Sequence, residues 1–592
     1  MLSSLIKPHG DRLVKLMATP KRAAELLAES VQLPSIILND RQLCDLELLL
    51  TGGFSPLEGF MGENEYESVL EDMRLSDGTL WPMPITLDVS EKIAVTIKAN
   101  DRILLRDKES FPLAVLTITD IWRPDLEGES EQVFGTTDHV HPGAFYLLDE
   151  SRPIYVGGTI EGISLPKHYD YQLLRHTPQR LRKMFVKQGW ERVVAFQTRN
   201  PLHRAHVELT LRAAAETGAN ILIHPVVGLT KPGDINHFTR VRCYEHILPR
   251  YPEGVALLSL LPLAMRMGGP REALWHAIIR KNYGCSHFIV GRDHAGPGRD
   301  STGKPFYDPY DAQDLVREHE SELGIVMVPF KNMVYVKEQA EYLPEDEVPK
   351  GMHILNLSGT EMRRRLPKKR DLPEWSYLED MTELHRRFEK GLELPEWFSY
   401  PEVVAELRRA QPPLSERGFT LFFTGLSGSG KSTLARGCMD KLLEDGHRPV
   451  TLLDGDIVRT HLSSELGFSR EHRSINIRRI GFVAGEVTRS GGIAICAPIA
   501  PYEADRQLNR RLISAYGGYL EVYVSTPLEV CEQRDAKGLY AKARQGLVKQ
   551  VTGIDDPYEI PADPEIVIDA SSEHPEALVQ KILQRIQQLG YL

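Results

Sequence analysis

The stretch GLSGSGKST at residues 425–433 restricts the possible folds more than any other part of the chain. It matches the pattern G-x-x-x-x-G-K-[ST] and stands between the apolar run FTLFFTG and a run with helical periodicity. In that setting the glycines allow a tight turn whose backbone N–H groups face phosphates at the N-terminus of the following helix. We therefore expect an α/β domain that binds a nucleotide; the alternative is a glycine-rich turn with an incidental lysine. The predicted nucleotide-binding residues are Gly425, Leu426, Ser427, Gly428, Ser429, Gly430, Lys431, Ser432 and Thr433.

The same motif and the next apolar run also predict which side chains bind the nucleotide phosphates and Mg²⁺. Lys431 is expected to reach the β- and γ-phosphates, and the hydroxyl of Ser432 to ligate Mg²⁺. The next apolar run ends in TLLDGDIVR, so Asp454 and Asp456 fall where a carboxylate can hold Mg²⁺ or accept a hydroxyl proton. We favour Asp456 as the base or metal contact and keep Asp454 as the alternative.

A second group of residues downstream suits an anion that carries a flat base. Arg459, Phe468, Arg473 and Asn476 supply two guanidinium groups, an aromatic ring and an amide. A solvated, charged helix is the alternative for this stretch. Further on, glycines flank the basic helical piece of residues 538–546, as in a mobile lid over phosphates.

These motifs resemble those of adenylylsulfate (APS) kinase. GLSGSGKST, DGD..R, LGFS..HR..NIRR, CEQRD.KGLY..AR.G and TGIDDPYE.P stand in that family's order. The resemblance implies phosphorylation of the 3′-hydroxyl of APS by MgATP to give PAPS. Ala500 replaces the family's usual serine, which excludes a phosphoserine route there, and Ile457 replaces the usual asparagine. The resemblance implies that APS contacts Asp454, Arg459, Phe468, Arg473, Asn476, Ile499, Lys537 and Gly538.

The chain has 592 residues, more than one core normally organises, so several domains are expected. The N-terminal part carries short alternating apolar segments broken by Gly, Pro and Asp, with helical stretches near 20–30 and 40–50. From residue 166, apolar strands alternate with helical runs, which predicts a parallel sheet. The expected organisation is a β-rich domain at 1–165, an α/β catalytic domain at 166–330, a small third domain and connector at 331–410, a linker at 411–418 and the P-loop domain at 418–592.

The stretch AFQTRNPLHRAHVE, residues 195–208, places cationic and polar side chains directly after an apolar strand. A metal site is one interpretation, but His203 and His206 are spaced i, i+3, lack the glutamate of the zinc-protease signature and have arginine neighbours. Histidines with only a capping or core role are a second. We favour an anion site, in which Arg199 and Asn200 lie in the loop and a helix that starts near His203 points its N-terminus at phosphate.

Three more polar turns follow apolar runs in the same region. GLTKPGD contributes Lys231 and Asp234, GRDHAGPG contributes Arg292 and the N–H of Ala295, and LSGTEMR contributes Arg363. Ligands of parallel sheets bind at the carboxyl ends of strands, where we expect these turns to meet. Each turn alone is a weak signal, and the four together indicate a shared anion site.

Together these turns resemble ATP sulfurylase, and the complete chain resembles bifunctional ATP sulfurylase/APS kinases of the bacterial kind. The resemblance implies a PUA-like N-terminal domain, a Rossmann-like nucleotidyltransferase domain, and attack of sulfate on the α-phosphorus of ATP with loss of pyrophosphate. The implied catalytic residues are Arg199, Asn200, His203, His206 and Arg292. The implied sulfate- and ATP-binding residues are Gln197, Thr198, Lys231, Asp234, Gly291, Asp293, Ala295, Ser358 and Arg363.

The composition of the chain limits the classes of molecule that it is expected to bind. A net charge of −11 argues against a nucleic-acid binder, and no apolar run reaches the roughly 18 residues of a membrane span. Scattered cysteines and the lack of a signal-peptide core predict a cytoplasmic protein. We expect Mg²⁺ and no zinc, small-molecule substrates (ATP, sulfate, APS and pyrophosphate) and, by analogy, a homo-oligomer. A non-catalytic nucleotide-binding scaffold is the rival, as is a C-terminal domain that only senses PAPS, although the intact Lys431 and Ser432 favour a working kinase.

Overall fold

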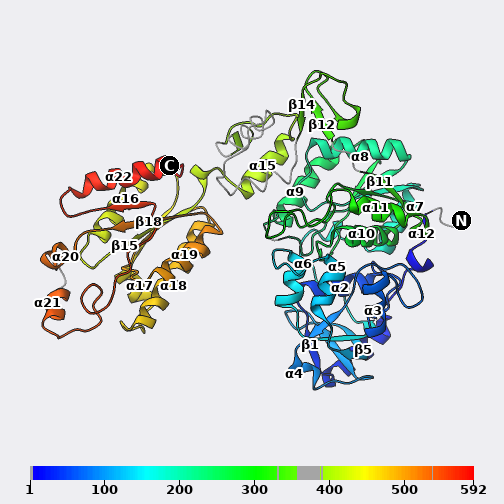
Figure 1. Cartoon of the computed structure of the whole chain (residues 1–592), viewed down its shortest axis with the longest axis horizontal. Coiled ribbons are helices and arrows are strands. Elements are labelled where there is room, and N and C mark those ends of the chain that lie inside the picture. Colours follow the sequence, from blue (N-terminus) through cyan, green and yellow to red (C-terminus); the bar gives the residue numbers. More distant parts are fainter. Residues whose placement is uncertain are drawn as a thin grey trace. The chain divides into compact units, whose positions relative to one another are not determined.

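The computed structural model describes residues 5–231, 233–329, 333–356, 384, 387–388, 391–535 and 538–592, without the side chains of Leu355, Asn356 and Asp456. The chain forms two compact units (Figure 1). The first comprises the described residues of Met1–Met381 together with Leu394–Glu406. The second comprises those of Thr382–Glu393 together with Leu407–Leu592.

The first unit begins with a mostly antiparallel sheet, as the alternating apolar segments predict. Its strand order is β1-β4-β5-β6-β2, and β3 pairs with β6 outside that path. The two expected helices are confirmed as α1 (Pro20–Glu29) and α2 (Asp40–Thr51), the latter started by a reciprocal Asn39–Gln42 capping box. The strands are β1 (Ser35–Ile37), β2 (Gly59–Phe60), β3 (Leu87–Val89), β4 (Arg102–Arg106), β5 (Pro112–Trp122) and β6 (Ile154–Gly162). The other helices of this part are α3 (Glu63–Asp72), α4 (Glu91–Ala94), α5 (Leu126–Phe134) and α6 (Pro142–Phe145).

A parallel α/β sheet follows, and its strand order fixes where a ligand can bind. The order is β11-β10-β7-β8-β9, and all neighbours are parallel. The chain thus winds outward from β7 in both directions, so the crevice beyond the ends of β7 and β10 is the topological switch point. The strands are β7 (Val193–Phe196), β8 (Asn220–Ile223), β9 (Ala256–Leu258), β10 (His287–Val290) and β11 (Val326–Pro329). The helices are α7 (Pro178–Gln188), α8 (Arg204–Thr217), α9 (His237–Ile247), α10 (Gly269–Tyr283), α11 (Asp311–Glu318) and α12 (Glu320–Leu323).

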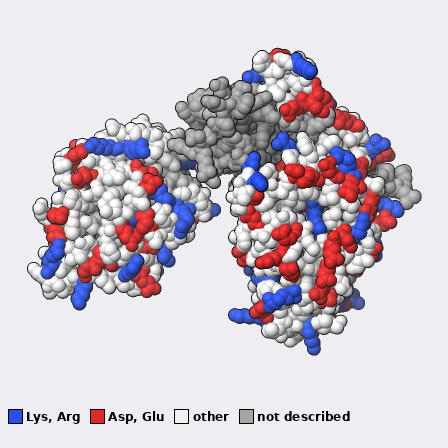
Figure 2. All heavy atoms as spheres, in the orientation of Figure 1, with Lys and Arg blue, Asp and Glu red and all other residues white. Residues whose placement is uncertain are grey.

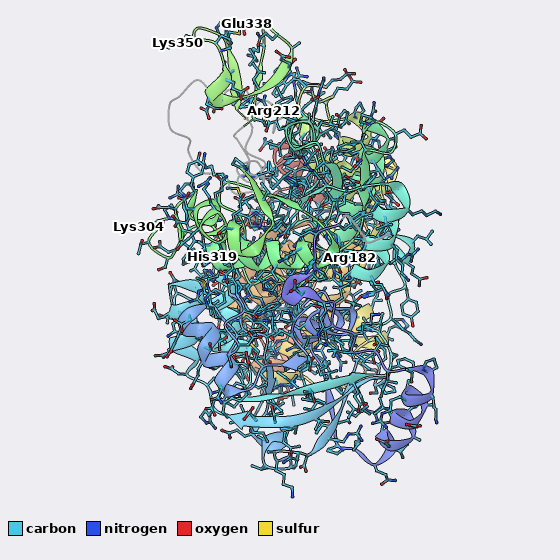
Figure 3. The ribbon with its side chains drawn as sticks, turned by 90° about the vertical axis from the view of Figure 1, so that its right-hand side faces the viewer. Arg182, Arg212, Lys304, His319, Glu338 and Lys350 are labelled. Carbon is cyan, nitrogen blue, oxygen red and sulfur yellow. The ribbon has the colours of Figure 1, made fainter. Side chains whose placement is uncertain are left out.

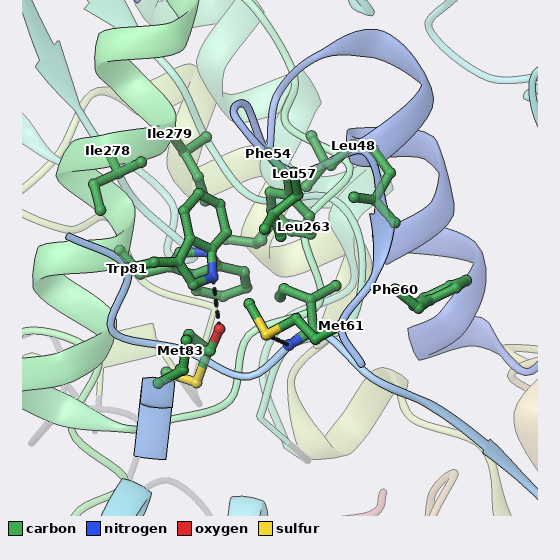
Figure 4. Packing of buried hydrophobic residues seen from close by; sticks show 14 of the residues in the cluster. Leu48, Phe54, Leu57, Phe60, Met61, Trp81, Met83, Leu263, Ile278 and Ile279 are labelled. Atoms are coloured by element: carbon green, nitrogen blue, oxygen red, sulfur yellow. Dashed lines mark hydrogen bonds between the residues drawn. The ribbon is translucent and has the colours of Figure 1, made fainter. Parts of the chain in front are cut away.

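The two parts of the first unit share one hydrophobic core. Side chains of the N-terminal part, such as Phe54 and Trp81, pack with Trp275 and Ile278 of α10 (Figure 4). The indole N–H of Trp81 donates to the carbonyl of Met83 at 2.7 Å, so its only polar atom is satisfied inside the core. A buried ion pair of Arg266 and Asp45, at 2.6 Å, joins the same parts. The shared core therefore joins the parallel sheet to the N-terminal sheet.

A small three-stranded antiparallel sheet projects from the first unit. In the described residues it has the order β13-β12-β14, and Glu338 and Lys350 mark it in Figure 3. Arg212 of α8 binds Glu347 beside this sheet at 2.7 Å. The strands are β12 (Met333–Val336), β13 (Glu341–Pro344) and β14 (Ile354–Asn356). The helix α15 (Pro401–Ala410) begins in the first unit and ends in the second.

The second unit is the predicted α/β domain, and it consists of a parallel sheet with helices on both faces. Its order is β16-β17-β15-β18-β19, with every neighbouring pair parallel. The strands are β15 (Phe419–Thr424), β16 (Val450–Asp454), β17 (Ile493–Ala497), β18 (Gly518–Val524) and β19 (Ile566–Ile568). The helices are α16 (Lys431–Asp445), α17 (Gly455–His461), α18 (Arg470–Arg489), α19 (Glu503–Ser514), α20 (Leu528–Arg534), α21 (Leu539–Arg544) and α22 (Pro575–Gln588).

Acidic and basic side chains intermingle over the described parts of both units on the face drawn in Figure 2. None of the helices in the described ranges is both long and apolar enough to cross a membrane. The domain boundaries given above remain predictions.

Candidate active sites

The turn after β7 is built as the sequence predicts. The strand ends at Phe196, and α8 begins at Arg204 with His203 as its N-cap. The hydroxyl of Thr198 accepts the N–H of Asn200 at 3.0 Å, and the hydroxyl of Tyr244 donates to the carbonyl of Asn200 at 2.7 Å. One hydrogen bond within the turn and one from α9 thus hold its backbone in place, and they fix the position of Arg199 between Thr198 and Asn200.

Arg199 is anchored to Asp234 of the second predicted turn. Its Nη1 lies 2.8 and 2.7 Å from the two carboxylate oxygens of Asp234. Both bonds use Nη1, and among the described residues Nε and Nη2 of Arg199 donate to no acceptor. An arginine held by one nitrogen keeps the rest of its fork for a ligand.

The turn after β10 carries two residues with left-handed backbone, Asp293 (φ 54°) and Ala295 (φ 55°). Within the described ranges no protein acceptor meets the N–H of Ala295, whereas the N–H of Gly296 donates to the carbonyl of Asp293 at 3.1 Å. The ammonium of Lys231 donates to the carbonyl of Pro297. The strained turn therefore leaves one backbone donor available for an anion.

Three of the four predicted turns come together. Arg199 contacts the 228–234 turn, and Lys231 of that turn contacts the 291–298 turn. Burial raises the pKa of the Asp293 carboxyl, while the nearby charges of Arg199, Arg292 and Lys231 act to lower it. The fourth turn, with Ser358 and Arg363, lies outside the described residues. Gly291 and the exposed Arg292 directly follow the end of β10.

His203 and His206 sit at the N-terminus of α8, with ring centroids 5.9 Å apart. The backbone N–H of His203 donates to Nδ1 of His206 at 3.1 Å. A neutral His206 must then carry its proton on Nε2, which becomes a hydrogen-bond donor. His203 Nδ1 lies 3.0 Å from the hydroxyl of Ser399, a contact that the sequence did not indicate.

A buried polar chain supports the 291–298 turn from behind. The carboxylate of Glu272 accepts the N–H groups of Arg266 and Gly268 at 3.0 and 2.8 Å. His276 Nε2 lies 3.2 Å from Glu272, off the line of a good hydrogen bond, and its Nδ1 lies 3.1 Å from Nε2 of His294. Burial holds the pKa values of both histidines below the ordinary range. The two histidines therefore serve as neutral supports of the turn.

The P-loop of the second unit has the predicted shape. Gly425, Gly428 and Gly430 have φ values of 149°, 73° and 105°, which residues with a Cβ rarely adopt. The loop runs directly into α16 at Lys431. Its first N–H, that of Gly425, donates to the carbonyl of Ile499 at 3.4 Å, and the N–H of Ser429 donates to the carbonyl of Leu426 at 3.2 Å.

Lys431 lies along the loop. Its ammonium donates to the carbonyl of Leu426 at 2.6 Å, so the cation stands over the loop. The side chains of Ser432 and Thr433 are exposed at the start of α16. Tyr540 of α21 donates its hydroxyl to the carbonyl of Ser427 at 2.9 Å, a contact that the sequence did not reveal. It ties the short helix after Gly538, at the predicted lid, to the P-loop.

The residues predicted to bind the second anion combine an exposed aromatic ring with buried polar groups. The guanidinium of Arg459 lies 4.4 Å from the centre of the Phe468 ring, and 68 % of that phenylalanine is exposed. Arg473 binds Asp556 at 2.9 Å and the hydroxyl of Thr552 at 2.9 Å. In the described part of the chain, buried Nε and Nη2 of Arg473 and Oδ1 of Asn476 meet no partner. Such orphaned polar atoms indicate a ligand site.

The remaining predicted residues of the second unit divide into two groups. Asp454 is buried at the end of β16, and the carbonyl of Ile499 accepts the hydroxyl of Thr424 at 2.8 Å beside the P-loop. The side chain of Asp456 and all of Lys537 lie outside the described residues. The buried Ala500 has a left-handed backbone, and its carbonyl accepts from Nη1 of Arg506 at 2.7 Å.

A metal site built from protein side chains alone needs several ligating side chains close together. Across the described ranges no group of three or more His, Cys, Asp or Glu side chains is placed to hold an ion. The expectation that the protein holds no zinc stays a prediction.

Family models match almost the whole chain. A PUA-like domain model matches residues 6–165, an ATP-sulfurylase model matches 172–383 and an adenylylsulphate kinase model matches 417–569. These segments coincide with the N-terminal sheet, the sheet that carries the three turns, and the P-loop sheet.

Relatives with assigned names match from end to end. The chain is 53 % identical to sulfate adenylyltransferases of Gibberella zeae, over 589 residues, and of Yarrowia lipolytica, over 588 residues, with 99 % of each chain covered. A solved structure, described as a hexameric APS kinase from Thiobacillus denitrificans, matches with a TM-score of 0.79 and 39 % identity. That match covers 99 % of this chain and 100 % of the other. The chain therefore belongs to the sulfate adenylyltransferase (ATP-sulfurylase) family, in the form that carries an adenylylsulphate kinase domain.

Proposed function

We propose that the first unit joins sulfate to the α-phosphorus of ATP, giving APS and pyrophosphate. The observation that carries this proposal is the meeting of three polar turns at the switch point between β7 and β10. The charges of Arg199, Lys231 and Arg292 all act on Asp293, two residues before the available N–H of Ala295. A group of turns with this much positive charge and a backbone donor suits two anions that must approach each other.

In this reaction sulfate binds between Gln197, Arg199 and the N–H of Ala295. Oε1 of Gln197 is buried and has no partner among the described residues. The oxygen and nitrogen of an amide can exchange places, so this side chain can present a donor to sulfate. Sulfate attacks phosphorus directly and pyrophosphate leaves, without a covalent enzyme intermediate. His206 Nε2–H, His203 and Arg292 neutralise charge on the phosphates, with Asn200 beside the reacting centre.

The second unit transfers the γ-phosphoryl group of ATP to the 3′-hydroxyl of APS. The P-loop holds the ATP phosphates. Lys431 binds the β- and γ-phosphates and stabilises their charge in the transition state. The orphaned Nε and Nη2 of Arg473 donate to the APS anion, the orphaned Oδ1 of Asn476 accepts from a hydroxyl or amino group of APS, and the exposed face of Phe468 stacks on its base. Ala500 has no hydroxyl, so transfer is direct. The complete P-loop favours a working kinase over a domain that only senses PAPS.

Magnesium suits the oxygen ligands of this unit. The exposed hydroxyl of Ser432 and the carboxylate of Asp454 are hard donors of the type that Mg²⁺ prefers. Bound there with ATP, the ion would neutralise phosphate charge. Asp456 is proposed as the base that accepts the hydroxyl proton of APS, with Asp454 as the alternative.

We further propose a cytoplasmic homo-oligomer that binds neither nucleic acid nor membrane. The Thiobacillus denitrificans protein, described as hexameric, supports the oligomer by analogy. The sulfurylase site can also run in reverse, making ATP from APS and pyrophosphate.

One preparation of the full chain tests both halves. Sulfate-dependent pyrophosphate release, ATP formation from APS and pyrophosphate, and PAPS formation from APS are measured side by side. We expect all three. No pyrophosphate release with sulfate would overturn the sulfurylase assignment, and APS without any PAPS would move the second unit to a regulatory role.

A further inference from the structure

The segment Leu394–Tyr400, here called the strap, packs onto the first unit although it follows the fourth predicted turn, residues 357–363, by some thirty residues of sequence. Two of its side chains, Phe398 and Ser399, are 4 % and 1 % exposed. Both contact His203 at the N-terminus of α8. The strap therefore reaches the proposed phosphate site from a part of the chain far from the turns that form it.

The two contacts with His203 are of different kinds. The hydroxyl of Ser399 lies 3.0 Å from Nδ1 of His203. The ring of Phe398 stacks on the imidazole, with centroids 5.1 Å apart and an angle of 29° between the planes. Together they set both the plane of the imidazole and its rotation within that plane, so Nε2 is aimed by the strap.

A hydroxyl partner has a specific advantage for this histidine. Ser399 can donate its proton to Nδ1 of a neutral imidazole, which keeps the ring proton on Nε2. It can equally accept the Nδ1 proton of an imidazolium. The ring thus keeps one orientation while its charge changes, as is useful beside phosphates whose charge shifts during reaction.

The strap is itself held on the first unit. The ring of Trp397 stacks on Tyr335 of β12 at 5.4 Å, and Tyr342 of β13 donates its hydroxyl to the carbonyl of Trp397. The guanidinium of Arg250 lies 5.0 Å from the centre of the Tyr400 ring. These contacts fix the strap on both sides of Phe398 and Ser399, so its position is not set by His203 alone.

We propose that Ser399 and Phe398 are positioning residues of the sulfurylase site, acting through His203. The ATP-sulfurylase model ends at residue 383 and the kinase model begins at 417, so the strap lies in neither matched region. The connector between the two domains thereby completes the first active site. This inference rests on the proposed sulfurylase function and on the role of His203 in it.

The test uses the full chain and substitutions at these contacts. Ser399→Ala removes the hydroxyl that lies 3.0 Å from Nδ1 of His203, and we expect sulfurylase kcat/KM to fall roughly 5- to 30-fold, the effect of one lost buried hydrogen bond. Ser399→Thr keeps the hydroxyl and should stay within about 3-fold of the original. Glu402→Gln is the matched control, because it removes an exposed ion pair with Arg250, at 2.9 Å, next to the strap and leaves both contacts with His203 in place. PAPS formation by the same preparations should not change.

A double-mutant cycle separates positioning from general stability. In a His203→Ala background, Ser399→Ala should cost no more than about 2-fold, since the group it positions is gone. Equal losses in both backgrounds would overturn the inference, as would full activity of Ser399→Ala. If Ser399→Ala does not fold, Phe398→Leu runs the same cycle through the ring contact. Absence of sulfurylase activity in the unsubstituted chain would instead refute the proposed function.

Discussion

Replacing Arg199 tests the two-anion site most directly. In the structure its Nη1 alone binds both oxygens of Asp234, at 2.8 and 2.7 Å, which leaves the rest of the fork for sulfate. Loss of one preorganised donor at a reacting centre costs about 100- to 1,000-fold, or about 3 to 4 kcal/mol of transition-state stabilisation. Arg199→Ala also takes the guanidinium away from Asp234, whose side chain is only 10 % exposed, so the carboxylate beside the sulfate loses that compensating charge. We therefore expect APS synthesis to fall at least ~100-fold.

Two further substitutions separate the contribution of the Arg199 fork from that of its anchor, Asp234. Arg199→Lys keeps the charge, but one ammonium cannot pair with Asp234 and also present a fork to sulfate, so at least ~30-fold should be lost. Asp234→Asn keeps the shape of the anchor and removes its charge, and only about 3- to 10-fold should be lost.

The assay is sulfate-dependent pyrophosphate release by the full chain, with PAPS formation from added APS as the internal control. PAPS formation should survive all three changes, because Arg199 belongs to the first unit. Near-normal pyrophosphate release by Arg199→Ala, or an equal loss for Asp234→Asn and Arg199→Ala, would refute the reasoning.

Three other predictions concern the kinase, the metal content and acid stability. Lys431→Ala should abolish PAPS formation and leave APS synthesis within about 2-fold, as a coupled assay would measure; loss of both would mean that the sites depend on each other. Elemental analysis should find no stoichiometric zinc, and activity should need Mg²⁺ and resist a zinc-selective chelator; one tightly held transition metal per chain would contradict this. Burial lowers the pKa of His141 to about 4, and its Nδ1 accepts the N–H of Gly143 at 3.1 Å, so the folded state prefers the neutral ring. Stability is then complete above the unfolded value of 6.5 and declines as the pH falls toward 4, by about 3 kcal/mol in total, a loss that His141→Asn should reduce in thermal unfolding series.

The local sequence by itself predicted those parts of each site that residues close together in the chain can form. The P-loop was readable because Gly425, Gly428 and Gly430 must take left-handed or extended-positive backbone angles, a demand that only glycine meets cheaply. The turn after β7 was readable for a similar reason, since a strand, a proline and a helix start follow one another within ten residues of Phe196. Such signals depend on backbone geometry and helix ends, which are encoded over a few positions.

The tertiary structure decided which side chains meet. The strand order β11-β10-β7-β8-β9 brings Arg199 to Asp234 and Lys231 to Pro297, and no pattern within one segment specifies that order. Ser399 lies 196 residues from His203 and carries no motif of its own. Its hydrogen bond exists because the strap is packed by Trp397 against the small sheet, a result of burial and ring stacking between distant segments. By itself the sequence determined the chemistry of each turn; the fold determined how those turns combine, because non-local packing fixes the positions of groups that the chain holds far apart.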